Sequence, residues 1–387
     1  MGSDQVNHFD IIVAGAGISG YSLLYQAMKA GIWADKQVLF IDKSFGNRPN
    51  KMISFWADSA TPFRDNSVAN WKKMVFYSHD GKKTPLDVGG YEYFSIDSKR
   101  LFETYHGYLS EFQNLCFLEA EVYASRYLGQ VCAVNTSRGD FTSTYVFSSL
   151  FERPDVTGQY QYFLQHFKGV QIQVNEPLHS PDEAVIMDYR TDQQHGATFF
   201  YCLPLSSHQL FVEYTLFSKS LLEEQQYDDA IEKYITSVLG ITNYVVLEEE
   251  KGVIPMTDSP FMRPRGKITY LGTAGGDTRG STGYTFTNVQ RTICSIITAF
   301  KKSGTPFFET EHIGAKEKLY DATLLAVLNE GNYQGHEVFT DLFRGTKAER
   351  IFRFLDSDSP LSNDLKIMLS LRKWPFAKHF IKALLRK

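Results

Sequence analysis

The sequence has few cysteines, no long apolar run and no excess of basic residues. Its formal net charge of −4 gives no electrostatic footprint for nucleic acid, so no nucleic-acid partner is expected. No run of about 18 apolar residues is present, so any contact with a bilayer is expected to be peripheral. The first predicted strand begins at Phe9, which leaves no room for a signal peptide. The scattered cysteines lack a C-x-x-C pair, which argues against a metal site or disulfide framework and fits a reducing cytosol. They are Cys116, Cys132, Cys202 and Cys294.

Aromatic residues, in contrast, are abundant. Thirty Phe and 22 Tyr bring the aromatic fraction to 14% of the 387 residues. Such a composition suits a pocket for a long apolar or π-rich ligand, but an aromatic-rich core accounts for it as well. Composition therefore leaves both interpretations open.

A strand, a glycine-rich turn and a helix are predicted in succession near the N-terminus. The β-branched apolar run 9–14 predicts a buried parallel strand, and the segment 15–20 leads into a helical pattern that ends near residue 30. A second buried strand is predicted over 37–41 and ends at Asp42, 22 residues after Gly20. This βαβ order, with an acid at the end of the second strand, predicts a dinucleotide site.

Each residue of the G-x-G-x-x-G pattern has a physical role in that site. Gly15 allows the tight turn out of the strand, Gly17 lets the backbone approach a pyrophosphate, and Gly20 permits close packing of helix on strand. The helix N-terminus offers free N–H groups and a partial positive charge to the phosphates. Asp42 is placed to bind the ribose hydroxyl groups.

A second glycine-rich loop favours FAD over NAD as the dinucleotide. A short strand over 267–271 is followed by this loop and by a helix over 286–303. A second helix N-terminus of this kind can hold the rest of the cofactor and face a flavin ring. NAD dehydrogenases need no such loop some 250 residues downstream. The predicted cofactor-binding residues of this loop are Gly272, Gly275, Gly276, Ser281, Thr282, Gly283 and Tyr284.

Several further motifs, taken together, resemble the bacterial FAD-dependent lycopene cyclases over roughly residues 9 to 360. The sequence departs from the family where Tyr214, and not a second acid, follows Glu213, and where Gly280 stands in place of the commoner Pro. Residues 51–56 match the family's early tryptophan motif only in part. The segments that carry the resemblance are 165–169, 186–189, 192–193, 200–206, 212–215, 250–257, 272–286 and 354–356.

The resemblance implies an α/β (α+β) fold: a Rossmann-like FAD-binding domain of the hydroxylase type with an inserted antiparallel substrate sheet and C-terminal helices. The alternating pattern over 158–216 agrees with such a sheet, and everything after about residue 315 is predicted to be helical. The expected FAD-binding domain comprises 1–70, 97–155 and 265–305. The expected substrate domain comprises 71–96 and 156–264, and the helical region spans 306–387.

The resemblance also implies a redox-neutral reaction, in which reduced FAD, kept reduced by NAD(P)H, supports closure of six-membered rings at the ends of lycopene or a related carotenoid. Closure needs a proton donor in an apolar pocket. Glu213 is the predicted acid, since burial disfavours its charged form. A Glu on a strand is otherwise most often solvated, and if Glu213 faces outward then Tyr214 faces inward and the assignment fails.

Other residues receive weaker assignments. Asp188 is predicted to relay a proton or to bind the loop near the flavin, although a structural acceptor role fits equally. Arg100 is predicted to contact the pyrophosphate, with a surface arginine as the alternative. The aromatic side chains predicted to assist a cation in the substrate pocket, or else to pack in the core, are Tyr189, Phe199 and Tyr201.

The C-terminal stretch 366–387 is basic and amphipathic. It contains seven Lys or Arg residues and no acid, interspersed with apolar residues that include Trp374 and Phe380. This pattern suits an anionic bilayer surface, with a solvated terminal helix as the alternative. The expected location is therefore cytoplasmic, with peripheral association at the inner face of the cell membrane.

Three other activities fit the same scaffold. A flavin monooxygenase or halogenase shares this scaffold, but no W-x-W-x-I-P halogenase signature is present. A reductase of prenyl double bonds would change the product mass, whereas cyclisation leaves it unchanged. A non-catalytic FAD-binding protein would not depend on Glu213 for its behaviour.

Overall fold

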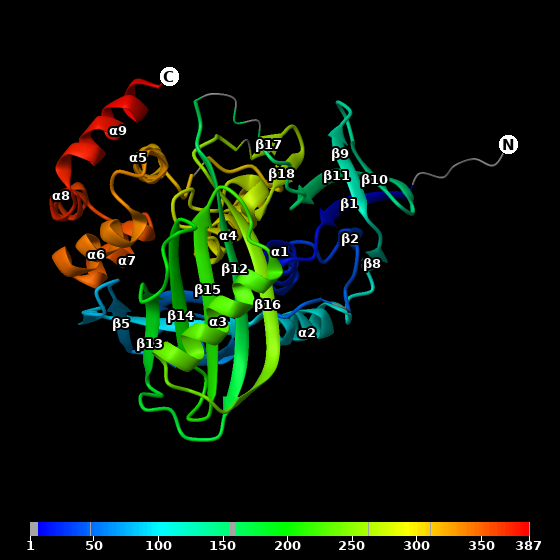
Figure 1. Cartoon of the computed structure of the whole chain (residues 1–387). Coiled ribbons are helices and arrows are strands. Elements are labelled where there is room, and N and C mark those ends of the chain that lie inside the picture. The colour runs from blue at the N-terminus through cyan, green and yellow to red at the C-terminus, as the bar shows by residue number, and fades with distance from the viewer. Residues whose placement is uncertain are drawn as a thin grey trace.

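The computed structural model describes residues 7–46, 48–154, 156, 159–261, 263–309 and 311–386, arranged around three β-sheets (Figure 1). In the first sheet β1 pairs in parallel with both β2 and β11, and the order is β17-β18-β11-β1-β2-β8. Strand β10 pairs with β11, and β9 pairs with β10. Its strands are β1 (Asn7–Ala14), β2 (Val38–Asp42), β8 (Leu115–Glu119), β9 (Val122–Tyr127), β10 (Cys132–Thr136), β11 (Gly139–Ser148), β17 (Pro264–Arg265) and β18 (Ile268–Tyr270).

Both faces of this parallel sheet are covered, which explains its continuous apolar strands. Ile11 and Val13 of β1 pack in a cluster with residues of three helices, α1 (Ile18–Lys29), α2 (Ser98–Leu109) and α4 (Phe286–Ser303). Ile12 points to the opposite face, where it packs with residues of β9–β11 and β18. The predicted βαβ unit is thus present, and the helix predicted over 286–303 matches α4.

The second sheet is mostly antiparallel and has the order β16-β12-β15-β14-β13-β5-β6. One face packs on α3 (Glu224–Lys233), as Figure 1 shows, and on the π-helix Tyr234–Val238. Its strands are β5 (Lys73–Tyr77), β6 (Lys83–Pro85), β12 (Tyr162–Val174), β13 (Glu183–Asp188), β14 (Ala197–Pro204), β15 (Gln209–Ser218) and β16 (Tyr244–Thr257).

A third, three-stranded sheet joins β3 (Met52–Asp58), β7 (Tyr91–Asp97) and β4 (Ser67–Trp71), with a 3-10 turn before β4. The expected domain boundaries at 70/71 and 96/97 fall inside strands β4 and β7 of this sheet. The division into domains otherwise remains a prediction.

Helices make up most of the chain after residue 314, as predicted. They lie beside the second sheet, on the side away from the β9–β11 strands (Figure 1). Phe339, Phe343 and Phe352 from these helices pack with Phe76 and Phe199 of the sheet. The helices are α5 (Ala315–Glu330), α6 (Gly335–Gly345), α7 (Ala348–Leu355), α8 (Leu361–Ser370) and α9 (Lys373–Leu385).

Candidate active site and dinucleotide site

The glycine-rich turn after β1 leaves room at the N-terminus of α1. Gly15 has φ +101°, which side chains rarely adopt, and a Cβ on Gly20 would lie 1.9 Å from the carbonyl oxygen of Gly15. Gly17, the N-cap of α1, has open space where a Cβ would stand and no side-chain cap on the helix. This cradle fits a pyrophosphate, since its free N–H groups have no competing partner.

Asp42 lies at the end of β2, beside this turn. Its Oδ2 accepts a hydrogen bond of 2.6 Å from the Ala16 N–H, and its Oδ1 forms an ion pair with Arg48. Arg48 also donates to the Ala16 carbonyl oxygen. Sequence reasoning missed Arg48, which adds a positive charge to the dinucleotide cradle.

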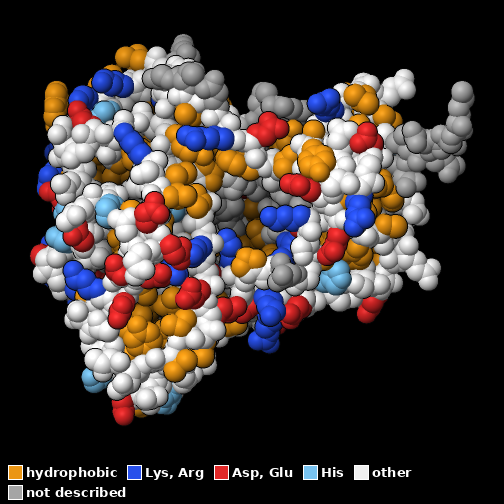
Figure 2. Space-filling model, turned by 45° about the vertical axis from the view of Figure 1, so that its right-hand side comes forward, with side chains coloured by type: hydrophobic (Ala, Val, Ile, Leu, Met, Phe, Trp, Pro, Cys, Tyr) orange, Lys and Arg blue, Asp and Glu red, His pale blue; other side chains and the backbone are white. Residues whose placement is uncertain are grey.

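The second glycine-rich loop lies against the first, although some 250 residues separate them. A Cβ on Gly272 would lie 2.5 Å from Ser19 Oγ of α1, and Gln290 of α4 hydrogen-bonds to both Gln26 and Ser22 of α1. The start of α4 therefore faces the same region as the start of α1. Figure 2 shows a hollow between the two lobes of the molecule, with basic side chains beside it.

The predicted residues of the second loop divide into those that face a cavity and those that hold the loop. Thr282, Gly283 and Tyr284 line the cavity described below. Ser281, in contrast, is buried and donates to Asp321 of α5 over 2.6 Å. Gly275 and Gly276 pack against Tyr270 and Phe261, where a Cβ would meet them at 2.2 and 3.2 Å. Ser281 is thus placed as an anchor of the loop.

Arg279 fastens this loop to the C-terminal helices. Its guanidinium, 1% exposed, forms a two-point ion pair with Asp321, at 3.0 and 2.7 Å, and donates to the Leu355 carbonyl oxygen over 2.9 Å. Two-point arginine–carboxylate contacts are among the strong polar interactions in proteins.

Replacement of Arg279 by leucine is expected to lower the free energy of unfolding by about 3–5 kcal/mol, because it leaves a buried carboxylate without its countercharge. Urea unfolding measures the change. Arg353→Leu is the control, since Arg353 pairs with Asp358 at the surface over 3.5 Å and its loss should cost at most about 1 kcal/mol. Equal effects of the two variants would refute the anchoring role.

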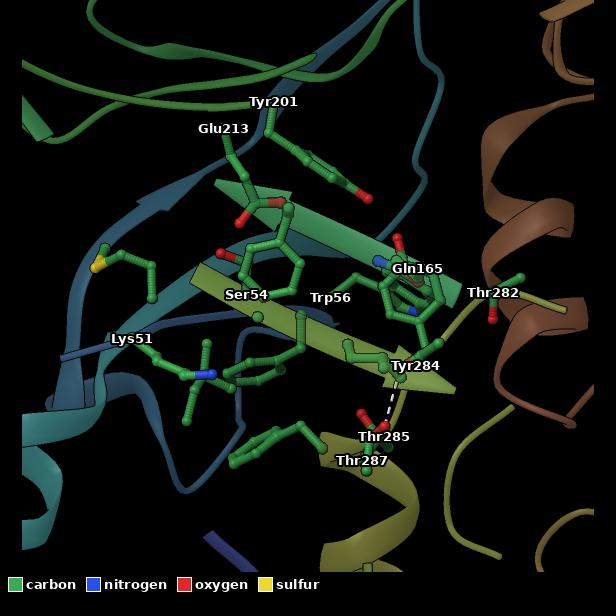
Figure 3. A pocket seen from close by; sticks show the side chains of 18 of the residues that line it. Lys51, Ser54, Trp56, Gln165, Tyr201, Glu213, Thr282, Tyr284, Thr285 and Thr287 are labelled. Atoms are coloured by element: carbon green, nitrogen blue, oxygen red, sulfur yellow. Dashed lines mark hydrogen bonds between the residues drawn. The ribbon is translucent and has the colours of Figure 1, made fainter. Parts of the chain in front are cut away.

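A cavity of about 260 Å³ lies between the second sheet, the third sheet and the start of α4 (Figure 3). Its walls include β3, with Lys51 just before it, and the segment 282–288 at the α4 N-terminus. Two of its lining residues, Gln165 and Thr282, carry buried polar atoms (Oε1 and Oγ1) that have no hydrogen-bond partner among the described residues. A ring with N–H donors, such as isoalloxazine, fits these acceptors.

Glu213 points into this cavity, and Tyr214 points to the other face of the sheet. Glu213 lines the cavity with Tyr201 and Phe211, whereas Tyr214 packs with the cluster beneath α3 (Figure 3). Side chains alternate between the two faces of a strand, so the Glu213 carboxyl faces the cavity while Tyr214 faces away from it. This is the orientation on which the assignment of Glu213 as the acid depends. Glu213 is 9% exposed and accepts a 2.7 Å hydrogen bond from Thr215 Oγ1.

A second carboxyl, that of Glu250 on β16, lines the same cavity. Its Oε2 accepts a 2.6 Å hydrogen bond from the Met52 N–H. Burial is the largest effect on both groups and raises the pKa of each; the charge of Glu213 raises the pKa of Glu250 further, while nearby Lys51 lowers both. Carboxylic acids that keep a proton near neutral pH can serve as proton donors.

Asp188 does not reach the cavity, which corrects its assignment as a catalytic residue. It is fully buried, forms a two-point ion pair with Arg190 and accepts a 2.6 Å hydrogen bond from Tyr234. Tyr234 belongs to the π-helix, on the face opposite to Glu213. The Asp188 carboxylate therefore fixes that helix to the sheet.

Of the three aromatic residues predicted to line the substrate pocket, one lines the cavity and two pack in the core. Tyr201 lines the cavity, and burial raises the pKa of its hydroxyl well above the ordinary value. Tyr189 and Phe199 are fully buried on the same face of the sheet, but they pack on each other and in a cluster with Phe339 of α6 and do not line the cavity. For these two, packing explains the position.

Arg100 lies in the first turn of α2 with an exposed side chain. Among the described residues its guanidinium has no hydrogen-bond or ionic partner. Its backbone N–H donates to the N-cap Asp97, and its carbonyl oxygen accepts from Thr104 Oγ1. Contact with a pyrophosphate remains a prediction.

A second, almost wholly apolar cavity of about 330 Å³ adjoins the first. Thr282 and Leu355 line both cavities. From this shared wall the second cavity extends between α5, α6, α8 and α9, where it meets Leu369, Phe376 and Phe380. The two cavities are thus neighbours that share a wall.

Sequence reasoning gave no role to four residues that the structure places at the sites: Arg48, Lys51, Gln165 and Glu250. Three of them lie inside segments that carried the family resemblance, or matched it in part, over 51–56, 165–169 and 250–257. The signal was therefore present, but the motifs alone do not show which side chains share a cavity.

The architecture is that of FAD-dependent hydroxylase-type flavoproteins. A geranylgeranyl bacteriochlorophyll reductase-like protein from Thermoplasma acidophilum superimposes with a TM-score of 0.62 at 11% identity, covering 97% of this chain and 99% of that chain. HpxO from Klebsiella pneumoniae, as a variant complexed with FAD, gives a TM-score of 0.60 at 14% identity, covering 92% and 100%. At these identities the likeness defines the fold class alone.

Within this class the chain belongs to the lycopene cyclase protein family, which matches residues 10–380. The lycopene beta-cyclase of Pantoea ananas is 26% identical over 265 residues, which cover 65% of this chain and 63% of that protein. The chloroplastic neoxanthin synthase of Solanum lycopersicum is 27% identical over 299 residues, covering 71% and 57%. The match thus spans less than two thirds of the length of either relative.

Proposed function

We propose that this protein binds FAD and catalyses the redox-neutral closure of six-membered, β-ionone-type rings at the ends of lycopene or a related linear carotenoid. The observation that carries the proposal is the Glu213 carboxyl, which is buried and faces a cavity walled by aromatic residues. Such a carboxyl can hold a proton at neutral pH and pass it to an alkene.

Three residues of the cavity have separate roles in the proposed ring closure. The Glu213 carboxyl donates its proton to the terminal double bond, the next double bond attacks the resulting tertiary cation, and a ring proton is lost. Tyr201 and Phe211 exclude water from the cation and offer it their ring faces, worth about 2 kcal/mol each when desolvated. The reduced flavin, when bound, supplies negative charge that favours this cation, and NAD(P)H is the proposed source of its electrons.

The cofactor would be held by the cradle at α1 and by the start of α4. Gly17 and Arg48 are placed for the pyrophosphate, and Asp42 for the ribose. The α4 N-terminus, whose N-cap Thr285 makes no side-chain cap, offers its free N–H groups and partial positive charge to an anionic ring. Gln165 and Thr282 present unpaired acceptors in the same cavity.

A long apolar substrate suits the two adjoining cavities. The end group would lie near Glu213, while the remaining polyene would pass Thr282 and Leu355 into the apolar cavity between the C-terminal helices. The burial of apolar area drives binding of such a chain at roughly 25 cal/mol per Å².

Anaerobic incubation with lycopene, FAD and NADPH tests the proposed function. A cyclase gives a product of unchanged mass with a blue-shifted absorption spectrum, because crowding around the new ring twists its double bond out of the plane of the polyene. A prenyl reductase would add two hydrogens per reduced bond, and a monooxygenase would act only with oxygen. A protein that binds FAD and leaves lycopene unchanged would end the proposal.

The same proposal includes docking on a membrane surface by α8 and α9. No helix in the described part of the chain is long and apolar enough to cross a bilayer. Leu361, Leu365 and Leu369 form an exposed stripe at four-residue spacing on α8, and Trp374 of α9 is 79% exposed. Basic residues on the same helices complement anionic lipids. Leu365 and Leu369 also line the apolar cavity, so a lipid-dissolved substrate would enter there.

Replacement of Leu369 and Trp374 together by serine is expected to lower the partition onto vesicles of phosphatidylserine and phosphatidylcholine by at least about tenfold, since each large apolar side chain contributes roughly 1.5–3 kcal/mol when buried. Vesicle co-sedimentation measures it. Leu128→Ser, at the exposed β9–β10 turn on the opposite side of the molecule (Figure 1), is the control. Unchanged partition of the double variant would exclude this docking face.

A further inference from the structure

Glu213 and Glu250 lie in a single row across the second sheet. Gly169 of β12 pairs with Glu213 on one side and with Glu250 on the other, and Tyr201 follows Glu213 on β14. Residues in one row across a sheet point to the same face, so all these side chains face the cavity. The two carboxyl-bearing strands are separated by β12 alone, or about 10 Å.

The residue between them has no side chain, and the space is filled by an aromatic ring. A Cβ on Gly169 would lie 2.6 Å from Cζ of Phe211 and 3.1 Å from Cγ of Glu250. The Phe211 ring therefore lies over Gly169 and reaches the stem of Glu250. Strand β12 has no side chain at this position of the row. The two carboxyls therefore lie on either side of the apolar Phe211 ring, and both face the cavity.

The charges around the two carboxyls do not balance if both are ionised. Among the described residues that line the cavity, Lys51 is the one cationic side chain, and it compensates a single negative charge. A second uncompensated carboxylate in a buried site is strongly disfavoured. Glu213 and Glu250 are 9% and 6% exposed, so one of them keeps its proton. The other ionisable groups near the pair are Tyr93, Tyr201, Tyr284, Glu248 and Asp356. Asp356 also lines the cavity, and Arg291 and Arg279 lie near its carboxyl.

We propose that Glu250 is the second acid–base group of the site and shares one proton with Glu213. The inference rests on the proposed cyclase function and adds a residue to it. Repulsion between the two carboxylates favours retention of that proton, and burial raises the pKa of both groups. The sequence has Tyr214 where relatives often carry a second adjacent acid, but a residue there faces away from the cavity, whereas β16 supplies an acid that faces into it.

The proton balance of ring closure uses both groups. The Glu213 carboxyl forms the new C–H bond at the terminal alkene and becomes a carboxylate, so two carboxylates face the cation. The ring C–H bond then breaks, its electron pair becomes the ring double bond, and the Glu250 carboxylate accepts the proton. One proton is given and one is taken back, and passage of that proton from Glu250 to Glu213 restores the pair.

Glu250→Gln tests the proposal, because the amide oxygen can still accept from the Met52 N–H and the fold is preserved. Lycopene turnover is expected to fall by about 100-fold with the FAD affinity and melting temperature unchanged. Glu250→Asp should recover part of the activity. Glu249→Gln, on the exposed neighbouring position of β16, is the matched control. Full activity of Glu250→Gln across the pH range would overturn the proposal.

An infrared titration of the protonated-carboxyl stretch gives a readout that does not need turnover. The last carboxyl proton of the unmodified protein should leave at a pH about one unit or more higher than in either Glu213→Gln or Glu250→Gln. Identical titrations would refute proton sharing. If the coupling is observed but the unmodified protein leaves lycopene unchanged, the cyclase function fails and the carboxyl pair stands.

Discussion

Replacement of Glu213 by glutamine is expected to abolish ring closure, with a fall in turnover of about 100- to 10,000-fold. Glutamine has nearly the same shape and can still accept from Thr215 Oγ1, but it has no acidic proton to give to an alkene. The product is measured by chromatography after anaerobic incubation with lycopene, FAD and NADPH. FAD should still bind, because Glu213 lies outside the glycine-rich cradle at the start of α1 that is placed to hold the pyrophosphate and ribose.

Two comparisons make this test specific. Glu232→Gln changes an exposed glutamate of α3, on the other face of the same sheet, and should leave turnover unchanged. The activity of the unmodified protein should fall as the pH rises above neutrality, since a raised pKa keeps Glu213 protonated at lower pH and the donor is lost when it ionises. Retained cyclisation by Glu213→Gln would remove Glu213 from the mechanism.

Replacement of Gly17 by valine is expected to weaken FAD binding by about 100-fold or more. The backbone at Gly17 has φ −73° and ψ −169°, which any residue adopts, and no atom lies within 4 Å of the position of a Cβ. The larger side chain therefore fits the protein alone but occupies the space of the pyrophosphate. A clash of roughly 3 kcal/mol corresponds to a factor of about 100 in the dissociation constant.

Fluorescence titration of the apoprotein with FAD measures the affinity, and thermal unfolding checks the fold. The free energy of unfolding of the apoprotein should change by no more than about 1 kcal/mol, the typical effect at an N-cap. Gly107→Ala is the control: Gly107 lies in α2 with open space around it, and alanine there should stabilise the helix by about 0.5–1 kcal/mol without effect on FAD. Unaltered FAD affinity of Gly17→Val would contradict the cradle.

Local patterns in the sequence were enough to predict the elements that bind or present ligands. Periodicity and glycine spacing predicted β1, α1 and β2 with Asp42 at the end of β2, and they predicted α4 after its loop. The alternation of Val212 to Thr215 tied the orientation of Glu213 to that of Tyr214, because a strand has a fixed period of two. The lycopene cyclase family was identified from motifs and is confirmed.

Tertiary structure decided which of the chemically suitable side chains share a site. The Asp188 carboxyl is fully buried, as a proton donor in an apolar pocket would be. Its position on the strand, however, directs it toward Arg190 and Tyr234 of the π-helix and not toward the cavity. Glu250 is 37 residues after Glu213 in the chain and is brought beside it only by the order of strands β16-β12-β15. Strand order and register depend on contacts between distant segments, and a single sequence carries no direct record of them. The sequence by itself therefore determined the local elements and the family, whereas the pairing of the strands decided which side chains lie together in the cavity.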